Sequence, residues 1–245
     1  MELLALVVVI ILIAVVAVAA VVHQRRLAEE RQRALRVLAE RLGLDFFAAE
    51  DPDHDDRYAR FAVFRQGHSR VAFNTMWGDV DIDGARHAVV MGDFRYRVTT
   101  RTGKTSSTVT YRLSYLIVHL PTPAVPDLLI RPEGLFDKLG QAIGFDDIDF
   151  EDAAFSRRFV VRSSDRRFAY DVCHPRMIEW LSAHAESFPA IDMEAGQLCL
   201  ATDKKRWEPT QFEQHLAYAR EFLIRWPDHV RRELGLHAPE QTHQR

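Results

Sequence analysis

The sequence predicts an α+β protein: an N-terminal transmembrane helix, then an antiparallel sheet, followed by mixed strand and helix elements and a long C-terminal helix. Three patterns predict this fold class. Residues 3–22 are all apolar, residues between 71 and 117 alternate between apolar and polar, and residues 210–226 repeat at spacings of three and four. The 15 Phe and 4 Trp side chains predict a packed core.

The apolar run 3–22 holds only Val, Leu, Ile and Ala. Twenty helical residues rise about 30 Å, which is the thickness of the hydrocarbon core of a bilayer. A cleaved signal peptide needs a basic leader and a shorter apolar core, although residues 17–19 imitate a cleavage triplet. We therefore expect residues 1–22 to form a transmembrane anchor.

The charges beside the anchor predict its orientation. Glu2 is the only charged side chain before it. The basic residues that follow it are His23, Arg25, Arg26, Arg31, Arg33, Arg36 and Arg41. Because Lys and Arg are retained on the cytoplasmic side, we expect a single-pass protein of the cell (inner) membrane, with the N-terminus outside and the C-terminal domain cytoplasmic. The two cysteines, Cys173 and Cys199, agree with a reducing compartment.

Residues 23–43 are predicted to continue the helix into water as a basic juxtamembrane stalk. The apolar residues of this segment form a narrow line of Leu27, Ala34, Leu38 and Leu42. Arg31 interrupts the line, so a solvated stalk is favoured over a short coiled coil. Gly43 is expected to end the helix.

The first half of the body predicts a meander of strands. After a polar loop at 50–56, three segments alternate with a period of two, around 71–77, 94–98 and 111–117. The last two flank a polar hairpin connection at 99–108. Each strand is expected to have one face in water.

Residues 44–235 are expected to form the cytoplasmic α+β domain. The proline-rich segment 121–126 is predicted to end the first sheet, and one core or two lobes divided there both fit the pattern. A short helix is predicted over 135–143, between Pro132 and Gly144.

A strand around Phe159 then leads to Ser164, the predicted N-cap of a helix that Pro175 breaks or restarts. A hairpin is expected to turn at 195–196. Thr210 and Glu213 are predicted to cap the long C-terminal helix. Its apolar stripe, predicted to face the core, is Phe212, Leu216, Ala219, Leu223 and Trp226. Pro227 should end or kink that helix, and residues 236–245 form a polar tail.

Asp79, Asp81, Asp83 and Gly84 match the opening of a calcium loop. The twelfth position, however, is Val90 where a bidentate Glu is needed. Strand alternation explains the pattern more simply, with Val80 and Ile82 pointing inward and the aspartates outward. A divalent-cation-responsive module therefore ranks third among the functions.

The acidic segment 146–152, from Asp146 to Asp152, has five carboxylates in its seven residues. Crowded carboxylates raise one another's pKa or collect a hard cation. The alternative function is therefore a membrane-bound hydrolase-type enzyme with a non-local site here. A solvated connection with Ile148 and Phe150 buried is the simpler interpretation.

Other short motifs lack the residues or the setting that a functional site of their kind requires. The triplet 103–105 (Gly-Lys-Thr) lacks the Gly of a phosphate-binding loop, because that position is Val98, and it is predicted to be a hairpin tip. Cys173 is not in a recognisable nucleophile setting. No catalytic, cofactor-binding or metal residue is assigned, and no cofactor is expected.

In the second half of the chain, a Pro-Glu pair at 132–133 comes before the acidic segment 147–152, which comes before a Phe-Ser strand region at 155–159. These features resemble a family of bacterial proteins in which one N-terminal membrane helix precedes a domain of unknown function. The resemblance covers about residues 44–234. It implies a shared fold and brings no activity.

These observations favour a non-enzymatic, membrane-anchored cytoplasmic binding or scaffold module. The bilayer holds it through residues 3–22, and an unknown protein or lipid partner is expected at the inner leaflet. Tethering raises the local concentration near other membrane components. Nucleic acid is not expected, because the body is mildly acidic. The sequence leaves the oligomeric state open.

Overall fold

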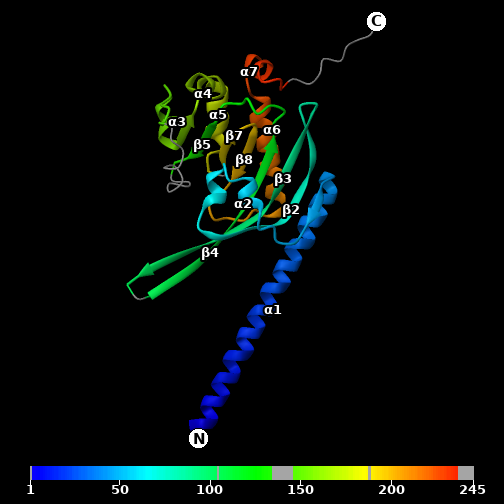
Figure 1. Ribbon diagram of the computed structural model, residues 1–245, viewed down its shortest axis with the longest axis vertical. Coiled ribbons are helices and arrows are strands. Elements are labelled where there is room, and N and C mark those ends of the chain that lie inside the picture. Colours follow the sequence, from blue (N-terminus) through cyan, green and yellow to red (C-terminus); the bar gives the residue numbers. More distant parts are fainter. Residues whose placement is uncertain (1, 104, 134–145, 187–188, 237–245) are drawn as a thin grey trace.

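The structure, a computed structural model, describes residues 2–103, 105–133, 146–186 and 189–236. In Figure 1, one long helix projects from a body that is built on a single sheet with helices packed against it. The predicted α+β fold class is confirmed. The helix predicted over 135–143 and residues 237–245 of the predicted tail lie outside the described residues.

Helix α1 (Glu2–Leu42) runs unbroken from the apolar segment through the predicted stalk. Its most apolar 18-residue window has a mean hydropathy of 3.3, and the body covers 0% of it. By length and composition, this helix is able to cross a membrane. Gly43 ends the helix as predicted: with a φ of 70°, it lets Leu44 N donate to Ala39 O at 2.8 Å.

The last turns of α1 differ from a solvated stalk. Leu35, Leu38 and Ala39 are buried against the body. They lie on the same helix face as Arg31, because positions i, i+4 and i+7 or i+8 face one way. Of the predicted apolar line, Leu38 is buried and Leu42 packs against the core, whereas Leu27 and Ala34 are exposed. The end of the helix therefore packs into the core on a face that overlaps the predicted line and also includes Arg31 and Leu35.

Within the described residues, eight strands form one antiparallel sheet in the order β1-β2-β3-β4-β8-β7-β5-β6. The strands are β1 (Asp45–Phe47), β2 (His68–Ile82), β3 (Ala85–Thr102), β4 (Thr105–His119), β5 (Leu128–Pro132), β6 (Phe159–Ser163), β7 (Ala190–Glu194) and β8 (Gln197–Ala201). Strands β2, β3 and β4 form the predicted meander, and β1, for which no strand is predicted, pairs with β2. Segment 121–126 does not end the sheet, because β8 returns to pair with β4.

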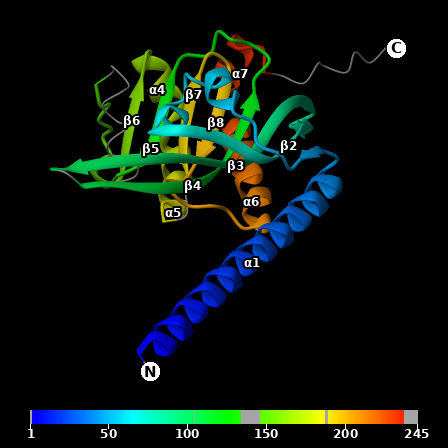
Figure 2. The same cartoon turned by 60° about the horizontal axis from the view of Figure 1, so that its bottom comes forward.

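Both faces of the central strands are buried, which corrects the prediction of one wet face each. Along β4, Leu116 and Val118 face one way and Tyr115 and Ile117 the other, and all four are fully buried. The first face packs against α1 and the later helices; Figure 2 shows α1 and α6 on one side of β3 and β4.

The second face is covered from within the polar stretch 50–56, which the sequence predicts to be a loop. The helix α2 (His54–Arg57) begins there, and the 3-10 helix η1 (Ala62–Arg65) follows. The His54 ring is buried, with its centroid 4.7, 4.8 and 4.6 Å from those of Tyr58, Phe64 and Tyr115. The polar sequence does not predict this buried cover, because His54 is counted as a polar residue although its ring packs as an aromatic side chain.

Two local details of the meander bear on the candidate sites. A bulge between Phe73 and Met76 breaks the single-face pattern predicted for 71–77, with Asn74 at a φ of 52°. The β2–β3 hairpin turns at Asp83 and Gly84, both with positive φ, as a two-residue turn of this kind requires.

The helices after β5 are α3 (Ala153–Arg158), α4 (Arg166–Val172), α5 (Pro175–His184), α6 (Pro209–Ile224) and α7 (Asp228–Glu233). Pro175 restarts the chain as a helix, as predicted. The N-cap of α4 is Asp165 and not Ser164, because the Asp165 carboxylate accepts from two backbone N–H groups of the first turn, at 2.8 and 3.2 Å. Pro132 belongs to β5, paired with Phe159.

Helix α6 starts earlier than predicted. Glu208 and Gln211 form its capping box, with Pro209 in the first helical position, and Thr210 and Glu213 do not. The predicted stripe is buried in full and Pro227 separates α6 from α7. Its core-facing role is confirmed.

Candidate functional site

A buried cluster of polar side chains joins α1 to the sheet and is centred on Asp93 in β3. The Asp93 side chain is 0% exposed. Its Oδ1 accepts from Ser114 Oγ at 2.7 Å, and its Oδ2 accepts from Asn74 Nδ2 at 3.1 Å. Ser114 lies directly opposite on β4, and the bulge in β2 turns Asn74 inward. Three strands thus build one acceptor site.

Arg31 of α1 supplies the cation for this site. Its Nε donates to Asp93 Oδ2 at 2.7 Å and its Nη2 to Asp93 Oδ1 at 2.6 Å, a two-pronged contact that suits the planar guanidinium. The same Nη2 donates to Trp207 O at 2.9 Å. Trp207 N donates to Ser114 Oγ at 3.0 Å, which closes the cluster on the segment before α6.

The surroundings of Arg31 make this pair a strong link. Only 11% of its side chain is exposed. Removing one partner of a buried pair costs about 3–5 kcal/mol, because the other charge stays buried. Further along α1, Arg41 Nη2 lies 2.8 Å from Glu213 Oε2 of α6. The end of α1 is therefore fixed to the sheet and to α6, so the body sets the direction of the helix.

Trp207 is held from two sides. Its ring stacks on His215 of α6, with centroids 3.8 Å apart and planes 4° apart, and its Nε1 donates to Thr202 Oγ1 at 2.8 Å. Burial lowers the pKa of His215 to about 4, so the ring is neutral at physiological pH. A neutral His215 stacks beside the Arg31 cluster without adding a second buried positive charge.

Sequence reasoning missed both members of the central pair. In the sequence, Arg31 interrupts a predicted apolar line, and Asp93 lies 62 residues away within an alternating strand. A signal did exist: Arg31 shares one helical face with Leu35 and Leu38, and Asp93 is the only carboxylate inside the buried run of β3. Each of these two features indicates that a partner is needed, but only the tertiary structure shows that Arg31 and Asp93 pair with each other.

The acidic segment 146–152 is engaged in local structure. Asp147 Oδ1 accepts from Arg162 Nε at 2.6 Å. Asp152 caps α3, accepting from two backbone N–H groups at 2.9 and 3.0 Å. Ile148 is buried, as predicted. These carboxylates hold the connection to α3 and β6 in place.

A surface groove of about 650 Å³ lies beside this segment, lined by Phe150, Asp152, Tyr170 and Ile178 among others. Cys173 contributes to its wall, but the thiol is buried and burial raises its pKa to about 12. A protonated thiol is a poor nucleophile. Burial in the wall of the groove therefore does not activate the Cys173 thiol as a nucleophile.

The three aspartates of the calcium-like pattern have separate partners. Arg86 Nη2 donates to Asp79 Oδ2 at 3.3 Å, Gly84 N donates to Asp81 Oδ1 at 3.1 Å, and Asp83 pairs with Arg231. Across the described residues, no group of three His, Cys, Asp or Glu side chains is placed to hold a metal ion. Gly103 turns the β3–β4 hairpin, as predicted for the 103–105 triplet.

Together, the fold and the junction define a class: an α+β body locked onto an apolar helix that is able to anchor in a membrane. The crystal structure of the mycobacterial trehalose monomycolate transport factor A, TtfA, is similar, with a TM-score of 0.52 and 16% identity over 80% of this chain and 96% of that chain. At this identity the likeness shows the fold alone. No protein-family model and no curated protein matches the chain, so the family resemblance stays a prediction.

Proposed function

We propose that this chain is a single-pass, membrane-anchored binding module that works at the cytoplasmic face of the inner membrane and is not an enzyme. In this proposal, residues 1–22 span the bilayer and the body meets a protein or lipid partner at the inner leaflet.

One observation carries the proposal: the apolar part of α1 is left uncovered by the body, with 0% of its most apolar window buried. Such a helix in water would expose a large apolar surface, which marks a membrane or partner interface. A bilayer satisfies that surface along its whole circumference, and the length of the run matches the hydrocarbon core.

The fold likeness supports a role of a related kind. The TtfA structure belongs to a protein named as a transport factor. We propose the same class of role for this chain, that of a transport factor, and not the substrate in that name. Because one fold hosts many functions, the identity of the neighbouring proteins in the membrane tests this part of the proposal.

The cytoplasmic orientation rests on the positive charges after the span. Arg25 and Arg26 lie within four residues of the end of the apolar run and are exposed, whereas Arg31 is turned into the body. Arginines this close to the end of a span favour its retention on the cytoplasmic side. The hydrolase alternative gains no specific support, because Asp147 and Asp152 stabilise local structure.

The anchor is tested with a pair of double variants in the centre of the run. Ile11→Arg with Val15→Arg should disfavour insertion, since each central Arg opposes it by about 2.5–3.5 kcal/mol. Ile11→Leu with Val15→Leu keeps the apolar character. We expect the wild-type chain and the Leu variant to resist carbonate extraction from membranes and the Arg variant to be released.

Topology and partners need two further measurements on the same variants. Protease added outside intact cells should leave the body uncut; digestion of the body would contradict the orientation. Neighbours crosslinked in intact cells should be membrane components and should disappear with the Arg variant. Crosslinks that persist without the anchor would argue against a membrane-dependent module.

A further inference from the structure

The end of the β3–β4 hairpin extends beyond the rest of the sheet. Pairing of β2 with β3 starts at His68 and Arg97, and pairing of β4 with β8 ends at Tyr115 and Ala201. From Val98 onward β3 and β4 therefore pair only with each other. A two-stranded ribbon without a packed face is marginally stable in water, so a contact with another surface would favour its extended form.

One face of this ribbon is basic. In the register of β3 with β4, Arg95 lies opposite Arg112, and Arg97 and Arg101 follow on the same face, because alternate residues share a face. Arg95 pairs with Glu50, whereas Arg97, Arg101 and Arg112 are exposed and have no described carboxylate within ion-pair distance.

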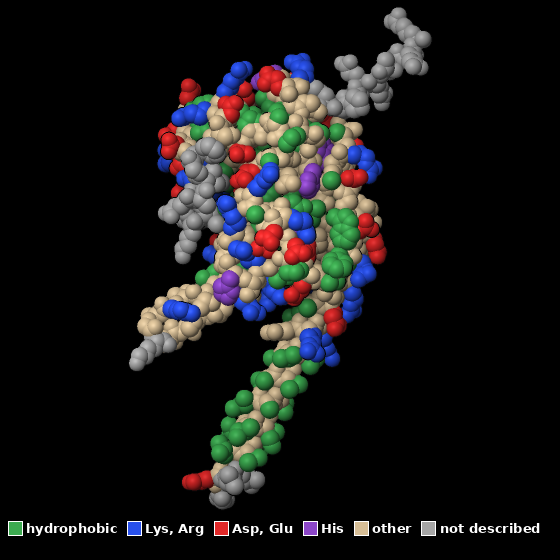
Figure 3. Space-filling model, viewed as in Figure 1, with side chains coloured by type: hydrophobic (Ala, Val, Ile, Leu, Met, Phe, Trp, Pro, Cys, Tyr) green, Lys and Arg blue, Asp and Glu red, His purple; other side chains and the backbone are tan. Residues whose placement is uncertain are grey.

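The charge of the whole hairpin has one sign. The sequence from 94 to 126 contains no Asp or Glu, but four Arg and one Lys. On the protruding hairpin in Figure 3, Arg side chains are seen in blue, and no Asp or Glu side chains in red. This stands out in a chain whose formal net charge is −3.

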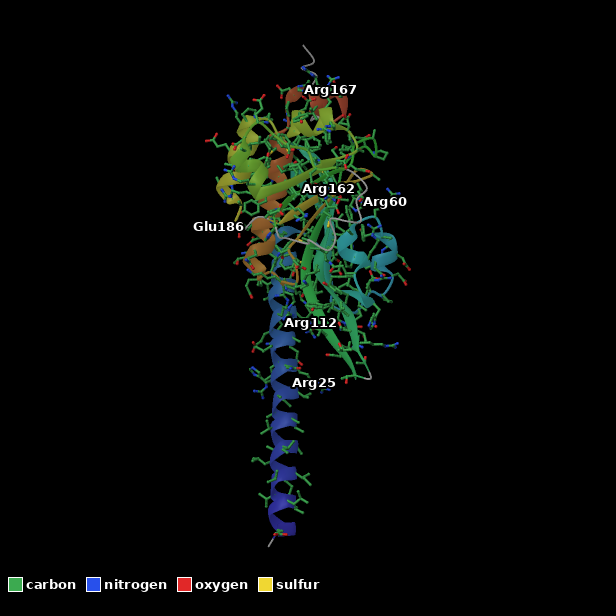
Figure 4. The ribbon with its side chains drawn as sticks, turned by 90° about the vertical axis from the view of Figure 1, so that its left-hand side faces the viewer. Arg25, Arg60, Arg112, Arg162, Arg167 and Glu186 are labelled. Carbon is green, nitrogen blue, oxygen red and sulfur yellow. The ribbon has the colours of Figure 1, made fainter. Side chains whose placement is uncertain are left out.

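The tip of the β3–β4 hairpin also lies level with the end of the apolar segment of α1 that is nearer the body. Figures 1 and 4 share the same vertical axis, and in both the hairpin descends from the body on the side of the apolar segment of α1. In Figure 4 its tip is level with Arg25, and Arg112 lies between that level and the body. Arg25 follows the last apolar residue, Val22, by three positions, or roughly 5 Å of helix. A bilayer that holds the apolar run thus has its surface near the hairpin tip.

We propose that the β3–β4 hairpin is a second membrane contact, in which Arg97, Arg101 and Arg112 bind anionic lipid headgroups of the same leaflet from which α1 emerges. This rests on the membrane anchoring proposed above and names the lipid partner of the module. Lys and Arg beside an anionic leaflet are attracted to it within about a Debye length. The rigid junction at Arg31 and Asp93 keeps the hairpin at the height where it reaches the surface.

The contact is tested on the full-length chain reconstituted into vesicles. Both native cysteines are buried, so a fluorophore reacts selectively with a cysteine introduced at Ser106, beside Thr105 at the start of β4. The lipids are phosphatidylcholine alone or with phosphatidylglycerol, each doped with a headgroup nitroxide quencher. A label at Arg167→Cys, at the far end of the body in Figure 4, is the matched control.

We expect quenching of the Ser106 label in phosphatidylglycerol vesicles, a large loss of it in phosphatidylcholine vesicles, and none at Arg167. Replacing Arg97, Arg101 and Arg112 with Ser should remove the quenching. The control variant replaces three other exposed arginines, Arg157, Arg166 and Arg176, with Ser. It has the same net charge and should keep the quenching.

The outcomes separate the two proposals. A chain that fails to float with vesicles overturns the anchoring and the hairpin contact together. A chain that floats while its Ser106 label is unquenched keeps its anchor but overturns the hairpin contact. Equal quenching of the Ser106 label with and without phosphatidylglycerol overturns the recognition of anionic headgroups. An equal loss of quenching in the hairpin arginine variant and in the control arginine variant overturns it too.

Discussion

The guanidinium of Arg31 and the carboxylate of Asp93 form a two-pronged pair at 2.7 and 2.6 Å, across 62 residues of sequence. The pair joins the helix that carries the apolar segment to the middle of the sheet. It turns what the sequence predicts to be a separate stalk into an element of the fold. The angle between the anchor and the body is consequently set by a buried interaction.

The first prediction concerns this pair. Asp93→Asn keeps the shape of the side chain but leaves Arg31 buried without its counter-charge, and should lower the free energy of unfolding by about 3–5 kcal/mol. Urea unfolding of the chain in detergent, followed by tryptophan fluorescence, measures it. Glu29→Gln, which breaks the exposed pair with Arg33 on the same helix, should leave the midpoint unchanged. Similar small effects in both variants would contradict the role of the junction.

The second prediction uses two neighbours on α1. Leu38 is buried against the sheet, whereas Val37 is 62% exposed. Leu38→Ala should therefore destabilise the body by about 2–5 kcal/mol, since it leaves a cavity in the core, and Val37→Ala should have little effect. Thermal unfolding by circular dichroism in detergent compares them. If the end of α1 were a solvated stalk, both variants would unfold at the wild-type temperature.

The third prediction is a pH dependence that arises at His54. Burial among aromatic rings lowers its pKa from 6.5 to about 3. As the pH falls below about 6.5, the unfolded chain binds a proton that the folded chain does not, so stability falls with pH. At pH 4.5 this amounts to roughly 2.8 kcal/mol, which is two pH units at about 1.4 kcal/mol per unit.

The variant His54→Phe isolates that effect, because a phenyl ring fits the aromatic surroundings and has no proton to bind. Urea unfolding at pH 7.5 and pH 4.5 should show a smaller loss of stability for the variant than for the wild type. The comparison is made as a difference because Asp192, whose pKa is raised to about 8 by burial, acts in the opposite direction over this range of pH. An equal loss in the two proteins would refute the assignment to His54.

The patterns that the sequence determined are those set within a few residues of the chain. The apolar run makes α1 able to span a membrane, alternation places Val80 and Ile82 inside and Asp81 outside, and the stripe of α6 faces the core. Each depends on local periodicity, and each is confirmed. Cap positions moved by one or two residues, because Asp165 and Glu208 compete with nearby side chains for the same backbone donors.

The tertiary structure alone decided which residues far apart in sequence meet. The return of β8 to β4, the cover that places His54 on the second face of the sheet, and the pairing of Arg31 with Asp93 all depend on long-range packing. A lone charge within a buried strand or on a buried helix face indicates that a partner is needed, because an unpaired buried charge is strongly unfavourable. The identity of that partner is set only by the tertiary structure, because neighbouring strands and the end of α1 bring these groups within hydrogen-bond distance.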